Sequence, residues 1–170
     1  MSIREAKKDD AYGIAKVHVK AWKVGYSEIM PKEYLDSLSI EQKIETWSKS
    51  LSEKSLGINL VIVEGKLIIG FCVFGPARDK DLSNNNFGEL VALNILPSHW
   101  GKGFCTMAIK HILKDSKAKK WSAIYLWVIK QNTRARAIYE AHGFIPDGTE
   151  KLDKTLTGHE LHEIRYVKML

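Results

Sequence analysis

The chain is poor in cysteine and in long apolar runs, and each scarcity excludes a class of protein. Its two cysteines, Cys72 and Cys105, lie in unrelated sequence contexts, so the disulfide framework of a small secreted domain is not expected. No stretch of about 18 apolar residues is available to span a bilayer. The first residues carry charge at once and contain no apolar signal core. We therefore expect a cytoplasmic protein with no membrane partner.

Metal-ligand spacings, repeats and linkers are missing as well. No cluster of His, Cys, Asp and Glu has the spacing of a metal site, so no bound metal is expected. No repeat, low-complexity stretch or Pro/Gly-rich linker divides the chain. A chain of 170 residues is long enough to bury a sizeable core, roughly 70% of its unfolded surface. We predict one domain over residues 1–170.

What the chain does have is positive charge, with a formal net charge of +6 and a pI near 9.2. Such a surface attracts anions, which could be nucleic acid, an acidic lipid surface or a phosphorylated cofactor. The Lys and Arg residues are spread along the chain, and the densest cluster, Lys114 to Lys120, lacks interleaved aromatics. This cluster indicates a solvated helix end, and no nucleic-acid partner is expected.

Hydrophobic periodicity predicts an α/β (or α+β) fold with a mixed central sheet flanked by helices. The expected element order is β-α-α-β-β-β-α-β-α-β-β. Strands are expected over 3–6, 58–63, 67–74, 87–96, 122–129, 149–154 and 159–170. Helices are expected after Asp9 and Asp10, from Pro31 through Trp47, from about Gly101, and from an Asn132 cap to Gly143. A tight turn at Gly65, a polar loop over 79–86 and a turn over 155–158 connect strands.

The strongest chemical signal is a strand that runs through Leu93 to Pro97 into the glycine-containing segment Gly101 to Thr106. Backbone N–H groups at a helix N-terminus lack intrahelical partners and attract phosphate groups. Gly101 and Gly103 would let the backbone approach such an anion, and Lys102 adds charge. Taken alone, the two glycines could equally ease a tight turn. The segment matches neither the dinucleotide fingerprint nor a P-loop.

A second motif about thirty residues later favours the phosphate interpretation. Asn132, Ala135, Ile138, Tyr139 and the pair Gly143-Phe144 have the pattern Asn-x-x-Ala-x-x-Ile-Tyr-x-x-x-Gly-Phe. Together with the glycine segment, this pattern resembles the paired motifs of the GNAT superfamily of N-acetyltransferases. The motifs cover roughly Glu89 to Phe144, and the expected element order extends the resemblance over the whole chain.

The resemblance implies that acetyl-CoA is the cofactor and that an amine acceptor, a small molecule or a protein amine, attacks its thioester directly. Pantetheine would pair with a strand, pyrophosphate would lie on the glycine loop, and two later residues would flank the thioester. Carried onto this sequence, the strand is Leu93, Asn94 and Ile95, the loop is Gly101, Lys102, Gly103, Phe104, Cys105 and Thr106, and the flanking residues are Asn132 and Tyr139. Many relatives dimerise, so a homodimer is also an expectation.

Two positions depart from the family pattern. Trp100 stands where the family usually has Gln or Arg, and Cys105 where it has Gly or Ala. Backbone amides do most of the phosphate binding, so these changes affect the expected affinity for the cofactor more than the binding mode. They also keep open an idle acyl-CoA-binding domain, alongside a transferase for a longer acyl group.

For catalysis, the resemblance implies that Tyr139 protonates the leaving thiolate and that Glu89 is a general base. An acidic residue on an apolar strand face suggests a raised pKa. The alternatives are that Tyr139 only packs, that Glu89 is a solvated or salt-bridged strand residue, and that water chains deprotonate the amine.

The first helix often forms part of the acceptor site in this family. His18, Trp22 and Tyr26 recur every four residues along it, which would place them on one side of the helix. These three side chains are candidates for the acceptor wall, and core packing explains His18 and Trp22 at least as well.

Overall fold

The computed structural model describes residues 1–53, 56–82, 86–155 and 157–170. Its elements in chain order are β1 (Ser2–Glu5), η1 (Lys8–Asp10), α1 (Ala11–Gly25), α2 (Lys32–Ser37), α3 (Ile40–Ser52), β2 (Ile58–Glu64), β3 (Leu67–Pro76), β4 (Phe87–Ile95), η2 (Pro97–His99), α4 (Phe104–Ala118), β5 (Ala123–Ile129), α5 (Thr133–Ala141), β6 (Ile145–Asp153) and β7 (Leu161–Met169), where η denotes a 3-10 turn.

Within the described ranges, the seven strands are hydrogen-bonded in the order β1-β2-β3-β4-β5-β7-β6. β4 pairs with β5 in parallel, whereas β1 and β2, β5 and β7, and β6 and β7 pair antiparallel. The mixed sheet and its helices confirm the predicted fold class. The β4–β5 register sets Glu89 opposite Tyr125, which matters for the site below.

The chain clusters into two compact units, and β3, β4 and α4 contribute residues to both. Unit 1 comprises Met1–Val73 and Ala92–Ala108, and unit 2 comprises Phe74–Val91 and Ile109–Leu170. The proposal of a single domain over residues 1–170 stays a prediction.

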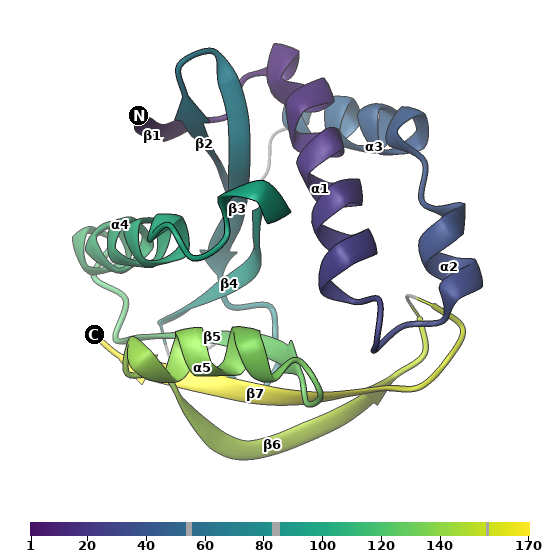
Figure 1. The fold of residues 1–170 in the computed structure, drawn as a ribbon. Helices are drawn as coiled ribbons and strands as arrows, with labels where there is room; N and C mark the ends of the chain where they lie inside the picture. The colour runs from purple at the N-terminus through teal and green to yellow at the C-terminus, as the bar shows by residue number, and fades with distance from the viewer. Residues whose placement is uncertain (54–55, 83–85, 156) are drawn as a thin grey trace. The chain divides into compact units, whose positions relative to one another are not determined.

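Unit 1 has an apolar core built by α1, β2, β3, β4 and the start of α4. Its members include Ile14, Val61, Ile69, Phe71 and Phe104, all buried. α1 and α3 lie side by side (Figure 1). One face of α1 therefore enters this core.

Unit 2 is organised around β5, which is buried along nearly its whole length. Burial of successive side chains is typical of a central strand covered on both faces. α5 lies against β7, since the Arg136 Nε donates to the Tyr166 hydroxyl at 2.9 Å and that hydroxyl donates to Glu140 at 2.7 Å (Figure 1).

The prediction of one continuous helix from Pro31 through Trp47 is wrong, because this segment forms two helices, α2 and α3. Leu38 is extended, with a ψ of 114°, and separates α2 from α3. Ser39 then caps α3 by accepting a hydrogen bond from the Gln42 amide at 3.3 Å. A serine hydroxyl satisfies a helix N-terminus better than a helix interior, which explains the break.

Several local predictions are confirmed. Gly65 turns between β2 and β3 with a φ of +60°. The Asn132 carboxamide caps α5 by accepting from the Ala135 amide at 3.1 Å, and Gly143 follows α5 with a φ of +79°. The expected polar loop and final turn fall partly on 83–85 and 156, outside the described residues.

Two elements start three or more residues away from the predicted position. α4 begins at Phe104, three residues after the expected start. β6 begins at Ile145, earlier than expected, and its pairing with β7 shifts between Pro146 and Glu150, where Gly148 has a φ of +89°. A glycine at positive φ interrupts the regular strand pattern on which the prediction depended.

None of the helices among the described residues is both long and apolar enough to cross a bilayer.

Candidate functional site

The glycine loop of unit 1 lies between η2 and α4. Gly101 and Gly103 have φ values of +73° and +83°, a conformation that side-chain-bearing L-residues rarely adopt. A side-chain carbon at either position would have no heavy atom within 4 Å. The loop therefore needs glycine for its backbone conformation, and the space around it is open.

This loop leads into a helix that can attract an anion. The α4 ladder starts with the Met107 amide, which donates to the Gly103 carbonyl at 3.0 Å. Amides in the first turn of a helix have no intrahelical acceptor and lie at the positive end of the helix dipole. With Lys102 exposed beside it, the loop fits a phosphate group.

Trp100 ties this loop back to β4. Its indole Nε1 donates to the Ile95 carbonyl at 2.8 Å, while the Leu96 amide donates to the Ile69 carbonyl at 2.8 Å. Trp100 thus anchors the end of the strand with a hydrogen bond that the sequence analysis did not foresee. Leu93 and Asn94, the other residues expected to pair with pantetheine, are half-buried.

The remaining loop residues differ in burial. Phe104 is buried in the unit 1 core, whereas Cys105 and Thr106 are half-buried. Asn132 and Tyr139 belong to unit 2, so the residues expected to bind the cofactor are divided between the two units. Tyr139 is half-buried, with its ring 5.9 Å from that of Phe144 at an interplanar angle of 64°.

Glu89 lies within a network of hydrogen bonds in unit 2. Its side chain is only 4% exposed. The Arg78 Nε and Nη2 donate to its two oxygens at 2.7 and 2.6 Å, and the Tyr125 hydroxyl donates at 2.9 Å. Burial alone would raise the pKa of Glu89, but the hydrogen bonds and charge of Arg78, with the Tyr125 hydroxyl, hold the pKa below its usual value. The expectation of a raised pKa is therefore wrong.

Tyr125 connects Glu89 to the segment after β3. Its hydroxyl accepts from the amides of Arg78 and Asp79 at 3.1 and 3.0 Å. Burial raises the pKa of this phenol. The Tyr125 hydroxyl thus positions both the Glu89 carboxylate and the backbone at Arg78, whose guanidinium pairs with that carboxylate.

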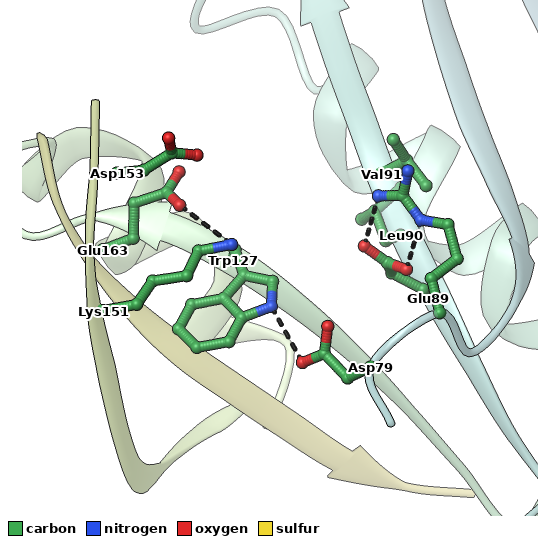
Figure 2. Close-up of a pocket in the computed structure, with 9 residues that line it drawn as sticks. Asp79, Glu89, Leu90, Val91, Trp127, Lys151, Asp153 and Glu163 are labelled. Carbon is green, nitrogen blue, oxygen red and sulfur yellow. Dashed lines mark hydrogen bonds and ion pairs between the residues drawn. The ribbon is translucent and has the colours of Figure 1, made fainter. Parts of the chain in front are cut away.

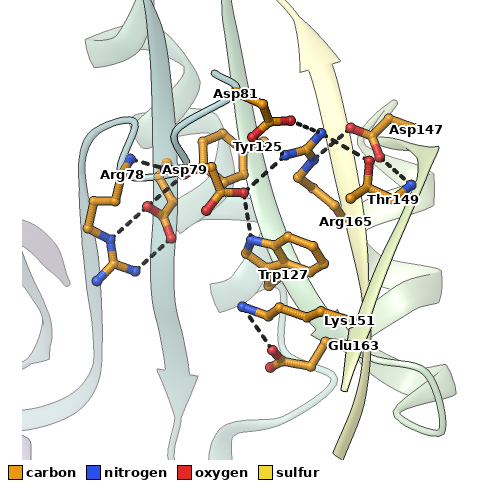
Figure 3. Close-up of polar contacts among 11 residues, drawn as sticks. Arg78, Asp79, Asp81, Tyr125, Trp127, Asp147, Thr149, Lys151, Glu163 and Arg165 are labelled. Atoms are coloured by element: carbon orange, nitrogen blue, oxygen red, sulfur yellow. Dashed lines mark hydrogen bonds and ion pairs between the residues drawn. The ribbon is translucent and has the colours of Figure 1, made fainter. Parts of the chain in front are cut away.

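A second ionic centre surrounds Arg165, whose side chain is 6% exposed. Its guanidinium pairs with Asp79 at 3.0 Å, Asp81 at 2.8 Å and Asp147 at 2.7 Å (Figure 3). Asp79 also accepts from the Trp127 indole at 3.0 Å. Burial opposes the charge of Arg165, but the three carboxylates raise its pKa.

The Trp127 pocket lies beside these two centres, with a volume of about 270 Å³ (Figure 2). It is lined by Arg78, Asp79, Glu89, Leu90, Val91, Trp127, Lys151, Asp153 and Glu163. Sequence reasoning found only Glu89 among these residues. The alternation of Tyr125 and Trp127 on the strand next to Glu89 is the signal that could have indicated a shared face.

The three residues expected to form the acceptor wall make an aromatic row in unit 1. The His18 and Trp22 rings are 4.9 Å apart, and the Trp22 and Tyr26 rings are 5.2 Å apart. All three are half-buried, and His18 also stacks near Phe71. His18 and Trp22 lie on α1 and Tyr26 follows its last residue. The role of the three side chains toward an acceptor stays a prediction.

His18 is held in its neutral form. Its Nδ1 accepts from the Trp47 indole at 3.3 Å, while its Nε2 is buried without a hydrogen-bond partner among the described residues. Burial, assisted by the charge of Lys43, lowers the pKa of His18 to about 4.

In the described part of the chain, no group of three or more His, Cys, Asp and Glu side chains is arranged to hold a metal ion.

Comparison with known proteins gives consistent matches. The model of the Acetyltransferase (GNAT) family matches residues 19–144. An uncharacterized N-acetyltransferase of Bacillus subtilis, YuaI, is 31% identical over 164 residues, which is 96% of this chain and 90% of that protein.

Solved structures agree in fold. The PaiA N-acetyltransferase of Thermoplasma acidophilum, crystallised in complex with coenzyme A, has a TM-score of 0.72 at 22% identity, covering 99% of this chain and 98% of that one. YncA of Salmonella typhimurium, with its cofactor acetyl-CoA, has a TM-score of 0.71 at 17% identity, covering 100% and 94%. The family match over most of the sequence shows that this chain belongs to the GNAT family of acetyltransferases.

Proposed function

We propose that the protein is an N-acetyltransferase that transfers the acetyl group of acetyl-CoA to an amine acceptor by direct attack. The observation that carries the proposal is the open glycine loop, with two left-handed glycines at the start of the fifteen-residue helix α4. The relatives crystallised with coenzyme A and acetyl-CoA support the choice of cofactor.

The loop residues Gly101 to Thr106 would hold the pyrophosphate, chiefly through backbone amides with Lys102 as an added charge. Leu93, Asn94 and Ile95 would pair with pantetheine along β4. Because the Asn132 side chain caps α5, its contribution would be to fix the start of the helix that carries Tyr139. When bound, acetyl-CoA supplies an acetyl group activated as a thioester.

The attacking amine must be neutral, and the departing thiolate needs a proton. Tyr139 would donate that proton from its phenol. The geometry of Glu89 favours its interpretation as a salt-bridged strand residue, since Arg78 and Tyr125 already engage both carboxylate oxygens. Water would then deprotonate the amine, with Glu89 shaping the polar surface that the amine meets.

Acetyl-CoA binding tests the loop assignment. Gly103→Val should lower affinity for acetyl-CoA about 10-fold or more, because a branched side chain would stand where phosphate approaches and would strain a positive φ. Gly148→Val is the matched control, since Gly148 also combines a φ of +89° with open space. Calorimetric titration of both folded variants decides the matter. Unchanged acetyl-CoA affinity in Gly103→Val would overturn the assignment.

Tyr139→Phe tests the chemistry. It removes one hydroxyl and leaves the ring that packs near Phe144. If the phenol protonates the thiolate, kcat should fall about 100-fold, with little change in KM for acetyl-CoA. The assay measures thiol release with an acceptor for which chemistry limits turnover, and Tyr12→Phe on an exposed tyrosine is the control. A kcat within a few-fold of the parent would remove Tyr139 from the mechanism.

A further inference from the structure

The Trp127 pocket is built entirely within unit 2 from segments far apart in the sequence. β4 supplies Glu89, Leu90 and Val91, β5 supplies Trp127, and the β6–β7 pair supplies Lys151, Asp153 and Glu163. Arg78 and Asp79 close it from the segment after β3. Its walls therefore combine an indole ring and two aliphatic side chains with charged groups of both signs (Figure 2).

The pocket carries a charge opposite to that of the chain. Four carboxylates against two cationic side chains leave a formal charge of −2, in a protein whose net charge is +6. The neighbouring Arg165 does not reverse the sign, because Asp81 and Asp147 accompany it. A concave site of this sign concentrates cations from solution and repels anions.

An ammonium group already occupies the pocket. The Lys151 Nζ lies 4.2 Å from the centroid of the Trp127 ring and 3.2 Å from Glu163 Oε2 (Figure 2). An indole face with an adjacent carboxylate is a favourable environment for an alkylammonium ion. Lys151 is half exposed on β6, the terminal strand of the sheet, so its flexible side chain can leave without disturbing a core.

Part of the pocket wall, beside the charged side chains, is apolar. Val91 is 41% exposed, although the two residues before it on β4 are buried. A cavity of about 270 Å³ compares with roughly 30 Å³ for each water molecule in the liquid. There is room for an alkyl chain of several carbons whose methylene groups would cover Val91 while its ammonium group meets Trp127.

We propose that the Trp127 pocket binds a protonated amine at the far end of the acceptor, so that the preferred acceptor is an alkyl di- or polyamine. This inference rests on the proposed transferase function and adds to it the class of acceptor. One amine of the acceptor takes the place of the Lys151 ammonium over Trp127 and beside Glu163, and the other amine accepts the acetyl group.

The test compares 1,5-diaminopentane with 5-amino-1-pentanol, which keeps one amine and the chain length but replaces the second ammonium by a hydroxyl. The parent protein should favour the diamine about 100-fold in kcat/KM, and Glu163→Gln should reduce this preference about 10-fold. Lys151→Met should instead tighten diamine binding about 10-fold, measured by calorimetry, because it removes the competing ammonium group from the indole and makes the pocket more negative. A role of Lys151 in stability alone would not tighten binding.

Lys154→Met and Glu160→Gln are matched controls, since these residues form an exposed ion pair of their own and do not line the pocket. Both should leave diamine affinity and preference unchanged. Equal use of the two acceptors, or Lys151→Met binding no tighter than the parent, would overturn the inference even if acetyl transfer is seen. Tighter diamine binding by Lys151→Met without acetyl transfer to any amine would support the pocket and overturn the transferase assignment. Acetylation of a lysine-containing peptide in preference to the diamine would also overturn the inference.

Discussion

His18 in unit 1 and Glu89 in unit 2 are two ionisable side chains withdrawn from water, and they respond in opposite ways. The pKa of His18 falls to about 4, so the imidazole is neutral at pH 7. The pKa of Glu89 is held below its usual value, so the carboxylate stays charged. Burial disfavours the charged form of both groups. The partners account for the difference: His18 meets a neutral indole and the like charge of Lys43, whereas Glu89 meets a guanidinium and a phenol.

The stability of the protein should therefore depend on the two side chains in different ways. His18 in unit 1 is buried in its uncharged form, so the free energy of unfolding should respond to pH. Unit 2 keeps Glu89 charged through Arg78, whose own side chain is 66% exposed and so gives up little hydration. Its stability should respond to loss of the partner. Three predictions probe this contrast.

Removing Arg78, the partner of Glu89, should have the largest effect on the free energy of unfolding. Arg78→Met leaves the Glu89 carboxylate buried without its counter-charge and should lower the free energy of unfolding at pH 7 by about 3 kcal/mol. The folded pKa of Glu89 should then rise above its unfolded value, so this variant should gain stability from pH 7 to pH 5. The parent carboxylate, with its lowered pKa, loses its contribution only as the pH falls below about 4.

Urea denaturation at several pH values measures this effect. Adding Glu89→Gln to Arg78→Met is the control, because a neutral amide in the same place needs no guanidinium. The double variant should recover part of the stability and lose the gain at pH 5. A single variant within about 0.5 kcal/mol of the parent, the usual range for surface substitutions, would mean that Arg78 does not compensate the charge.

Removing the phenol should have an intermediate effect. Tyr125→Phe deletes a hydroxyl that donates to Glu89 and accepts from two backbone amides, and should lower the free energy of unfolding by about 2 kcal/mol. Tyr12→Phe, on an exposed tyrosine, should change it little. Equal urea midpoints for the two variants would contradict the role given to Tyr125.

Protonation of His18 should have the smallest effect on the free energy of unfolding. Its folded pKa lies below the unfolded value, so the unfolded chain takes up the proton first, and stability should fall as the pH drops from about 6.5 to about 4. His18→Phe should remove about 1 kcal/mol of this decline, a value reduced for the partial exposure of the ring. Unfolding free energies at pH 7, 6 and 5 measure the slope, with His159→Phe as the control. Parallel slopes for parent and His18→Phe would show that His18 is not the group responsible.

Much of the fold could be predicted because its signals are local. The buried run of β5, the Gly65 turn and the Asn132 cap are each contained within a few residues. The break at Leu38 escaped prediction because the apolar spacing continues across it, and only the capping hydrogen bond of Ser39 reveals the second helix. The late start of α4 also escaped prediction, because the spacing of apolar residues does not reveal the positive φ of Gly101 and Gly103.

In the candidate site, too, features contained in one segment could be predicted, and features built from distant segments could not. The glycine loop is one short motif, so the sequence indicates all of its residues together, and their role toward the cofactor stays a prediction. Glu89 was found too, but its pKa was misjudged because Arg78 lies eleven positions away across a loop. The Trp127 pocket was missed since its walls come from four strands and a connecting segment. Periodicity in one segment carries no information about which side chains meet across a sheet.

The left-handed glycines have a stereochemical consequence. At Gly101 and Gly103 the backbone takes the conformation preferred by residues of the opposite chirality, in surroundings with no atom near an added side-chain carbon. An L-alanine at either position would be strained by roughly 1–2 kcal/mol. A D-alanine, introduced by chemical ligation, would adopt this backbone conformation without that strain and would restrict the unfolded chain. The loop is in this sense a mirror-image turn within an L-protein.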